Sequence, residues 1–370
     1  MNMKTSEAHF FSLMQAALWG TPVNLNGDVD WHEVMGIARF HATTTLVADV
    51  ALRLPEGNRP SDDRQAKLKG ALRSNLFSQI ESKQILTKVV TTLRENGIEP
   101  VLLKGFGLAQ LYPNPALRQF GDNDLFVGLS CFHEACALVR SLPGAYTWCM
   151  EVDAGRHYNV EFGNVVFEIH RVSAEMTDPK ENALYAAIEH DGLVAHVQQI
   201  DLDGFPITIP SKEFMVFFTF FHAWHHFTTT GVGWRQVSDV AMALHVYHGQ
   251  IDLDKLRQWL ETMCLMQPWQ AFGYLIVNCL GLPENEMPFF NASCRRRAQK
   301  VYHRVMAEGN FRRPNRFKNQ KPKNKLLHKL HAFILVFIDF FHLASLFPQY
   351  AFKELRNSLK QGFRKNLFKK

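Results

Sequence analysis

The sequence GDNDLFV at residues 121–127 places two carboxylates, those of Asp122 and Asp124, two positions apart. The Gly-Asp pair and the apolar residues after it predict a turn that leads into a β-strand. Alternate residues of a strand point to the same side, so Asp122 and Asp124 project together. Two carboxylates held this close repel each other unless one is protonated or a cation bridges them. The spacing therefore predicts a site for a divalent metal ion.

A third carboxylate, that of Glu168, lies in the run VVFEIH at residues 165–170, which also predicts a strand. If this strand pairs beside the first, three carboxylates meet at one point. Mg²⁺ prefers oxygen ligands, and two such ions can hold the attacking and leaving oxygens of a phosphoryl transfer. His170 lies on the same strand face as Glu168, where it would contact a substrate or orient the acid through a hydrogen bond.

A further strand is predicted at residues 101–103, a short apolar run after Pro100. It ends at Lys104-Gly105, and residues 106–112 have the spacing of a short helix that prolines terminate. This part of the chain has a pattern that resembles the nucleotidyltransferase superfamily of DNA polymerase beta type. In order along the chain, the pattern consists of a strand, Lys-Gly, a short helix, Tyr-Pro, Arg, Gly-Asp-x-Asp and a later strand that ends in acid-x-His. More narrowly, the chain resembles a bacterial family of uncharacterised nucleotidyltransferases, with the motifs at residues 98–172.

The resemblance implies that Asp122, Asp124 and Glu168 are the catalytic residues and bind Mg²⁺, or Mn²⁺ in its place. It also implies a nucleoside triphosphate (NTP) as donor substrate, bound near Gly105 and His170.

One position departs from the superfamily pattern. The superfamily's Gly-Gly or Gly-Ser after the first strand is Lys104-Gly105-Phe106 here, so a serine hydroxyl is missing. Lys104 and Arg118 are the candidates to hold the triphosphate instead.

The flanking sequence predicts helices. Residues 62–95 carry a long amphipathic stripe, residues 31–54 have a roughly helical period, and residues 211–308 are again helical. The expected fold class is α+β, with a small mixed β-sheet as the nucleotidyltransferase core, embedded between N-terminal and C-terminal helical regions. The expected division is an N-terminal helical region (1–97), the core (98–210), a C-terminal helical region (211–310) and a basic tail with an apolar helix (311–370).

Composition narrows the class of protein. With 370 residues, 46% of them hydrophobic and 21% charged, the chain is globular. Its six cysteines form no C-x-x-C pair, which excludes a zinc ribbon and suits a reducing compartment. The first twenty residues lack the pattern of a secretory signal, so we expect a cytoplasmic protein.

The net charge of +6 is unevenly distributed. Residues 311–370 hold 15 lysines and arginines against two acids, a charge of +13, so the remainder of the chain carries −7. Basic character therefore belongs to the tail, and nucleic-acid binding by the whole protein does not follow from it.

The tail contains an apolar segment at residues 331–352 with Asp339 near its middle. The segment would nearly span a bilayer, but the aspartate costs about 2.5–3.5 kcal/mol on insertion scales and Pro348 breaks the helix. It is interpreted first as a buried helix. The alternatives are peripheral contact with an anionic membrane, docking of a partner, and, less favoured, binding of nucleic acid.

The sequence thus predicts a Mg²⁺-dependent enzyme that moves a nucleoside monophosphate from an NTP to an acceptor hydroxyl and releases pyrophosphate. The alternative is a catalytically inactive protein that keeps the fold and binds a nucleotide, a membrane or a partner. His222 and His226 have metal-ligand spacing, but no glutamate completes an H-E-x-x-H motif. The acceptor, the base preference and the oligomeric state stay open.

Overall fold

The computed structural model describes residues 3–148, 155–176 and 178–311 and, toward the C-terminus, residues 334, 337, 340, 341 and 343–367. Within them, a seven-stranded mixed sheet has the order β3-β4-β5-β2-β1-β7-β6. The strands are β1 (Val101–Leu102), β2 (Asp122–Phe126), β3 (Ala145–Tyr146), β4 (His157–Phe162), β5 (Val165–His170), β6 (Gln198–Asp201) and β7 (Pro206–Ile209). The mixed sheet and its flanking helices confirm the predicted fold class.

The strand pairing places the two acid-bearing strands side by side. β2 lies between β1, which is antiparallel to it, and β5, which is parallel to it. β4 and β5 form an antiparallel hairpin whose turn contains Gly163 with a φ of 60°. β6 and β7, which the sequence did not predict, extend the sheet beyond β1.

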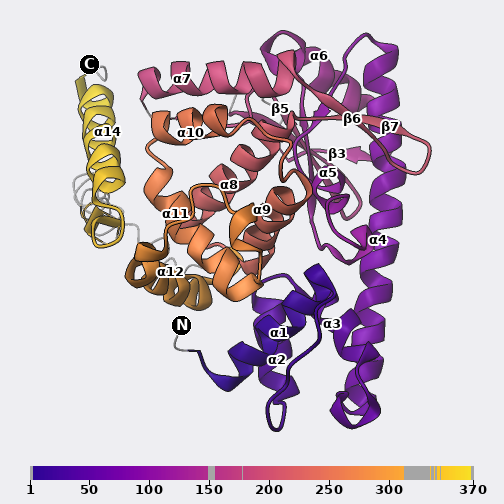
Figure 1. Cartoon of the computed structure of the whole chain (residues 1–370). Coiled ribbons are helices and arrows are strands. Elements are labelled where there is room, and N and C mark those ends of the chain that lie inside the picture. Colours follow the sequence, from indigo (N-terminus) through magenta and orange to yellow (C-terminus); the bar gives the residue numbers. More distant parts are fainter. Residues whose placement is uncertain are drawn as a thin grey trace.

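Four helices precede the sheet: α1 (Thr5–Trp19), α2 (Trp31–Phe40), α3 (Thr44–Arg53) and α4 (Asp62–Glu95). α4 has the predicted bounds and runs along the right-hand side of the molecule in Figure 1, from α2 and α3 up to the sheet. The continuous helical period predicted over residues 31–54 is wrong in one respect. Ala42 has a φ of 55°, which a right-handed helix excludes, so the segment is divided into α2 and α3.

The helices within the core are α5 (Phe106–Ala109), α6 (Gly128–Ser141) and α7 (Pro179–His190), with the short turns η2 (Pro115–Leu117) and η3 (Asp191–Ala195). α5 is shorter than the predicted helix of residues 106–112. After Ala109 the chain makes bonds of the i to i+3 type, from Leu111 N to Leu108 O at 3.2 Å and from Tyr112 N to Ala109 O at 3.0 Å. α4 and α6 both contact β5, so they cover one face of the sheet.

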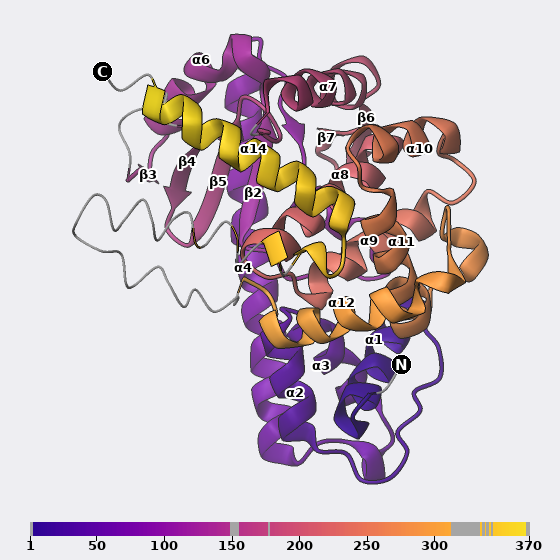
Figure 2. The same cartoon turned by 90° about the vertical axis from the view of Figure 1, so that its left-hand side faces the viewer.

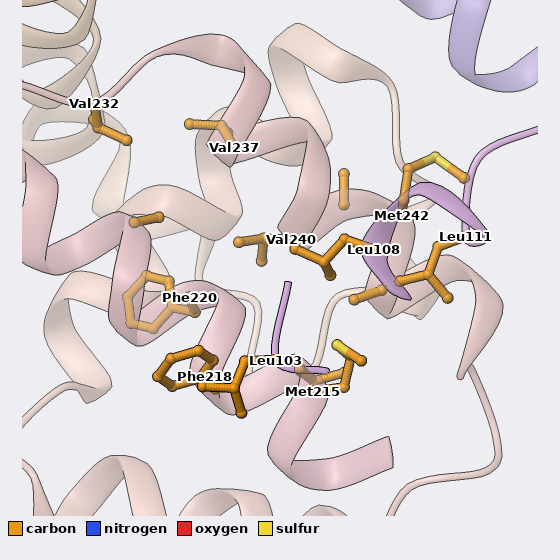
Figure 3. Packing of buried hydrophobic residues seen from close by; sticks show 14 of the residues in the cluster. Leu103, Leu108, Leu111, Met215, Phe218, Phe220, Val232, Val237, Val240 and Met242 are labelled. Carbon is orange, nitrogen blue, oxygen red and sulfur yellow. The ribbon is translucent and has the colours of Figure 1, made fainter. Parts of the chain in front are cut away.

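The C-terminal region contains α8 (Lys212–Thr229), α9 (Trp234–Val246), α10 (Leu253–Thr262), α11 (Met266–Leu275), η4 (Ile276–Leu280) and α12 (Arg295–Glu308). Ser211 caps α8 by accepting from Phe214 N at 3.2 Å. Figure 3 shows Met215 and Phe218 of α8 and Val240 of α9 packed around Leu103 and Leu108. This core fixes α8 and α9 against the segment that carries Lys104.

The last helix, α14 (Pro348–Leu367), lies on the opposite side of the molecule from α4 in Figure 1 and crosses in front of α8 in Figure 2. The rings of Phe347 and Tyr350 contact Trp224 of α8, with centroids 5.0 and 4.9 Å away. Lys353 pairs with Glu181 of α7 at 3.2 Å. The described end of the predicted apolar segment is therefore packed on the helical region, as its first interpretation expects.

Much of that segment, including Asp339, lies outside the described residues. Among the residues that are described, no helix combines the length and the hydropathy needed to cross a bilayer.

Candidate functional site

The three acids predicted from the sequence meet on one face of the sheet. Asp124 and Glu168 are directly opposite in the parallel pairing of β2 with β5. Asp122, Asp124 and Glu168 each offer a carboxylate oxygen, and these oxygens lie within 4.8 Å of one another. Asn123 points to the other face, where its side chain donates to Ser82 of α4 at 2.8 Å. Strand alternation therefore sends both aspartates away from α4.

Two protein cations contact this acidic group. Asp124 is fully buried, and its Oδ1 atom accepts from Lys104 Nζ at 2.9 Å and from His170 Nε2 at 3.0 Å. His170 Nε2 also lies 3.2 Å from Glu168 Oε2, whereas Lys104 Nζ lies 3.8 Å from Asp122 Oδ2. Asp124 Oδ2 is buried and has no hydrogen-bond partner among the residues that the structure describes. An orphaned carboxylate oxygen between two other carboxylates suits a metal ion as its missing partner.

These contacts keep Asp124 and Glu168 ionised. Burial opposes charge on every group here, but the neighbouring opposite charges outweigh it. Lys104 and His170 lower the pKa of Asp124, and His170 lowers the pKa of Glu168 from 4.5 to about 2. In return, the carboxylates raise the pKa values of Lys104 and His170 against the effect of burial. The site is therefore a group of carboxylates held ready for a cation.

His157 is a site residue that the sequence analysis missed. It pairs with His170 across the β4–β5 hairpin, and its Nδ1 atom lies 3.7 Å from Glu168 Oε2. His157, Glu168 and His170 form a second group whose ligand atoms could hold a metal ion. The turn at Gly163-Asn164 was predictable, and counting back from it would have placed His157 opposite His170.

Gly105 shapes the loop that carries Lys104. It has a φ of 66°, and a Cβ atom there would lie 3.0 Å from Asn123 Oδ1 and 3.2 Å from the Asp122 carbonyl oxygen. Only glycine combines that conformation with so close an approach to β2. The predicted Lys104-Gly105 element thus follows the acidic strand closely, which brings Lys104 Nζ onto Asp124.

Arg118 lies beside this loop in a buried network. Its Nε and Nη2 atoms donate to Asp239 at 2.6 and 2.9 Å, and its Nη1 atom donates to the Gly105 carbonyl at 3.1 Å. Tyr112 also donates to Asp239, at 2.7 Å. Arg118 therefore connects the Gly105 loop to α9, and its predicted contact with a triphosphate stays a prediction.

A cavity of about 220 Å³ joins these parts. Its lining includes Lys104, Gly105, Arg118, Asp122 and Glu168 from the core. α8 and α9 close it with polar side chains, among them His222, His226, Arg235 and Asp239. Carboxylates and basic side chains thus face the same cavity. A site for a metal ion and a phosphate chain requires both kinds of group.

His222 of α8 contacts Lys104, and the described residues show no metal-ligand group that includes a histidine of α8. His222 Nε2 lies 3.1 Å from both Lys104 Nζ and His226 Nε2. Because the ammonium can only donate, His222 Nε2 accepts and carries no proton. Burial, followed by the charge of Lys104, accordingly holds the pKa of His222 well below its usual value.

A family model described as an uncharacterised nucleotidyltransferase matches residues 27–281. The chain belongs to this family. The match covers the sheet, the acidic group and the helices that close the cavity, and it ends before α12 and α14. The comparison with curated proteins found no match. The family description agrees with a cavity that combines acids able to hold a metal ion with basic side chains.

Proposed function

We propose that the protein is a Mg²⁺-dependent nucleotidyltransferase of the DNA polymerase beta type, with Mn²⁺ as the alternative ion. It moves a nucleoside monophosphate from an NTP to an acceptor hydroxyl. The observation that supports this most is that carboxylate oxygens of Asp122, Asp124 and Glu168 lie within 4.8 Å of one another, beside a cavity that Asp122, Glu168 and Lys104 line. The orphaned Asp124 Oδ2 supports a metal ion at this site.

In this proposal Asp122 and Asp124 hold the ion that binds the triphosphate. Glu168 joins them in holding a second ion beside the acceptor. Bound metal supplies positive charge to the phosphate oxygens and lowers the pKa of the acceptor hydroxyl. Glu168 lies on the acceptor side and takes the hydroxyl proton or accepts a hydrogen bond from it.

The reaction balances without a further reactant. The acceptor oxygen forms a bond to the α-phosphorus, and the bond between that phosphorus and the bridging oxygen to the β-phosphate breaks. Pyrophosphate leaves with the electron pair, and the hydroxyl proton passes to Glu168 or through it to water. Lys104 offsets the negative charge on the phosphates during transfer.

The acceptor is proposed to enter from a second cavity. This space of about 230 Å³ shares Arg156 and His222 with the first and is lined by Thr228 of α8. α14 closes it through Tyr350 and Lys353. α14 lies beyond the residues that the family model matches, so this wall of the cavity is formed outside the matched part of the chain.

The test is incubation with each α-labelled NTP, Mg²⁺ and a cell extract that supplies acceptors. Label should move from the nucleotide to a product in the wild type and be lost in Asp122→Ala/Asp124→Ala. Glu134→Gln, which changes an exposed acid of α6, serves as the control and should transfer normally. Label transfer that is equal in the wild type and the double variant, or absent from both, would support the nucleotide-binding alternative instead.

A further inference from the structure

Arg235 is a partly buried cation that forms no ion pair with Asp122, Asp124 or Glu168. It lies in the first turn of α9, and its side chain lines the cavity that holds Lys104, Asp122 and Glu168. Its Nη1 atom donates to the Gln119 carbonyl oxygen at 3.0 Å. Its Nε atom is buried, and no described residue forms a hydrogen bond with it.

The nearest acid is already occupied. Both oxygens of Asp239 accept from Arg118 at 2.6 and 2.9 Å, and Tyr112 adds a third donor. Among the described residues, no carboxylate forms an ion pair with Arg235. Arg118 thus occupies Asp239, and Arg235 is left without a paired carboxylate among the described residues. Burial, followed by repulsion from Arg118, lowers the pKa of Arg235.

An unpaired guanidinium in a water-poor space is costly unless an anion binds to it. The first turn of α9 is the positive end of that helix's dipole, so it also favours an anion. Guanidinium suits phosphate in particular, because its planar set of donors can contact two oxygens at once.

We infer that Arg235 binds the polyphosphate chain of the donor nucleotide, on the part of the cavity lined by α9. This assignment rests on the proposed function for the identity of the donor. The metal-binding acids would hold one part of the triphosphate, and Arg235 would bind oxygens of the phosphates that leave as pyrophosphate. Arg118 positions the neighbouring loop, and Arg235 is the direct phosphate ligand.

Inorganic tripolyphosphate is the probe, because it presents the phosphate chain without base or sugar. Isothermal titration should show that the wild type binds it, with pyrophosphate weaker and orthophosphate weakest. Arg235→Gln should lower the affinity for tripolyphosphate at least tenfold. Arg235→Lys, which keeps the charge but loses the planar set of donors, should lower it less.

The control is Arg257→Gln, which changes an exposed arginine of α10 that stacks on Phe289, and it should bind like the wild type. Thermal melting without ligand separates the binding role from the structural contact with Gln119. If Arg235→Gln melts far below the wild type, the tripolyphosphate affinity of Arg235→Lys is compared with that of the wild type instead.

The inference is overturned if the wild type does not bind tripolyphosphate, or if both Arg235 variants bind it as tightly as the wild type. Failure of the proposed function looks different. In that case labelled nucleotide is not transferred, while the loss of tripolyphosphate affinity in Arg235→Gln persists.

Discussion

The buried pair of Arg118 and Asp239 allows a quantitative prediction of stability. The two side chains are 3% and 4% exposed, so water cannot replace a lost partner. Asp239→Asn removes the charge that faces Arg118 and leaves two guanidinium groups, those of Arg118 and Arg235, without a carboxylate. Removal of one partner from a buried pair costs about 3–5 kcal/mol of the free energy of unfolding.

Urea denaturation followed by tryptophan fluorescence measures this loss. The matched control is Asp191→Asn, because Asp191 pairs with Lys255 at 3.0 Å and the two side chains are 28% and 30% exposed. A pair with that exposure contributes about 0–1 kcal/mol.

A compensated variant tests the cause. Arg118→Met combined with Asp239→Leu removes both buried charges, and part of the lost stability should return because no unpaired ion remains. The reasoning is refuted if Asp239→Asn costs no more than Asp191→Asn, or if the double variant is as unstable as the two single losses combined.

Three further predictions follow from single residues. Gly105→Ala should destabilise the protein by roughly 1–3 kcal/mol and slow nucleotidyl transfer, because φ is 66° and the new Cβ atom would lie against β2. The control is Gly70→Ala, which adds a Cβ atom in open space on α4 and should not destabilise the protein. Equal melting temperatures of the Gly105→Ala variant and the wild type would contradict this prediction. Burial lowers the pKa of His41 from 6.5 to about 3. Below pH 6.5 this histidine is therefore protonated in the unfolded chain but not in the folded chain, so the free energy of unfolding falls as the pH drops. Between pH 7 and pH 5 the wild type should therefore lose about 2 kcal/mol more than His41→Phe in urea melts, and parallel losses would reject the assignment. Thr228→Phe, which fills the second cavity, should lower label transfer to acceptors at least tenfold and leave the affinity for a nonhydrolysable NTP unchanged. If label transfer by this variant equals that of the wild type, the second cavity is not the acceptor entrance.

The acidic site was predictable because it depends on local rules. Strand alternation fixes which way Asp122 and Asp124 point, and the Gly163-Asn164 turn fixes the hairpin that carries Glu168. α4 was predicted with correct bounds because a long amphipathic period outweighs local exceptions. What the sequence left open was the pairing of β2 with β5, which the structure shows to be parallel and adjacent.

Residues that depend on long-range contacts could not be assigned from the sequence. Arg118 and Asp239 are 121 positions apart, and their mutual contact decides that Arg118 is engaged and Arg235 is not. β6 and β7 are short, and β7 is fixed by its pairing with β1 more than by a pattern of its own. The division of the chain into regions 1–97, 98–210, 211–310 and 311–370 stays a proposal, and one hydrophobic core contains residues from all four regions.

The central claim is that Asp122, Asp124 and Glu168 together hold a divalent cation. Electron paramagnetic resonance of Mn²⁺, titrated with protein and a nonhydrolysable NTP, measures this directly. The wild type should bind Mn²⁺, Asp122→Asn and Glu168→Gln should each lose at least tenfold in affinity, and Glu134→Gln should bind like the wild type. Mn²⁺ affinity that is the same in the wild type and in the Asp122 and Glu168 variants would contradict the account.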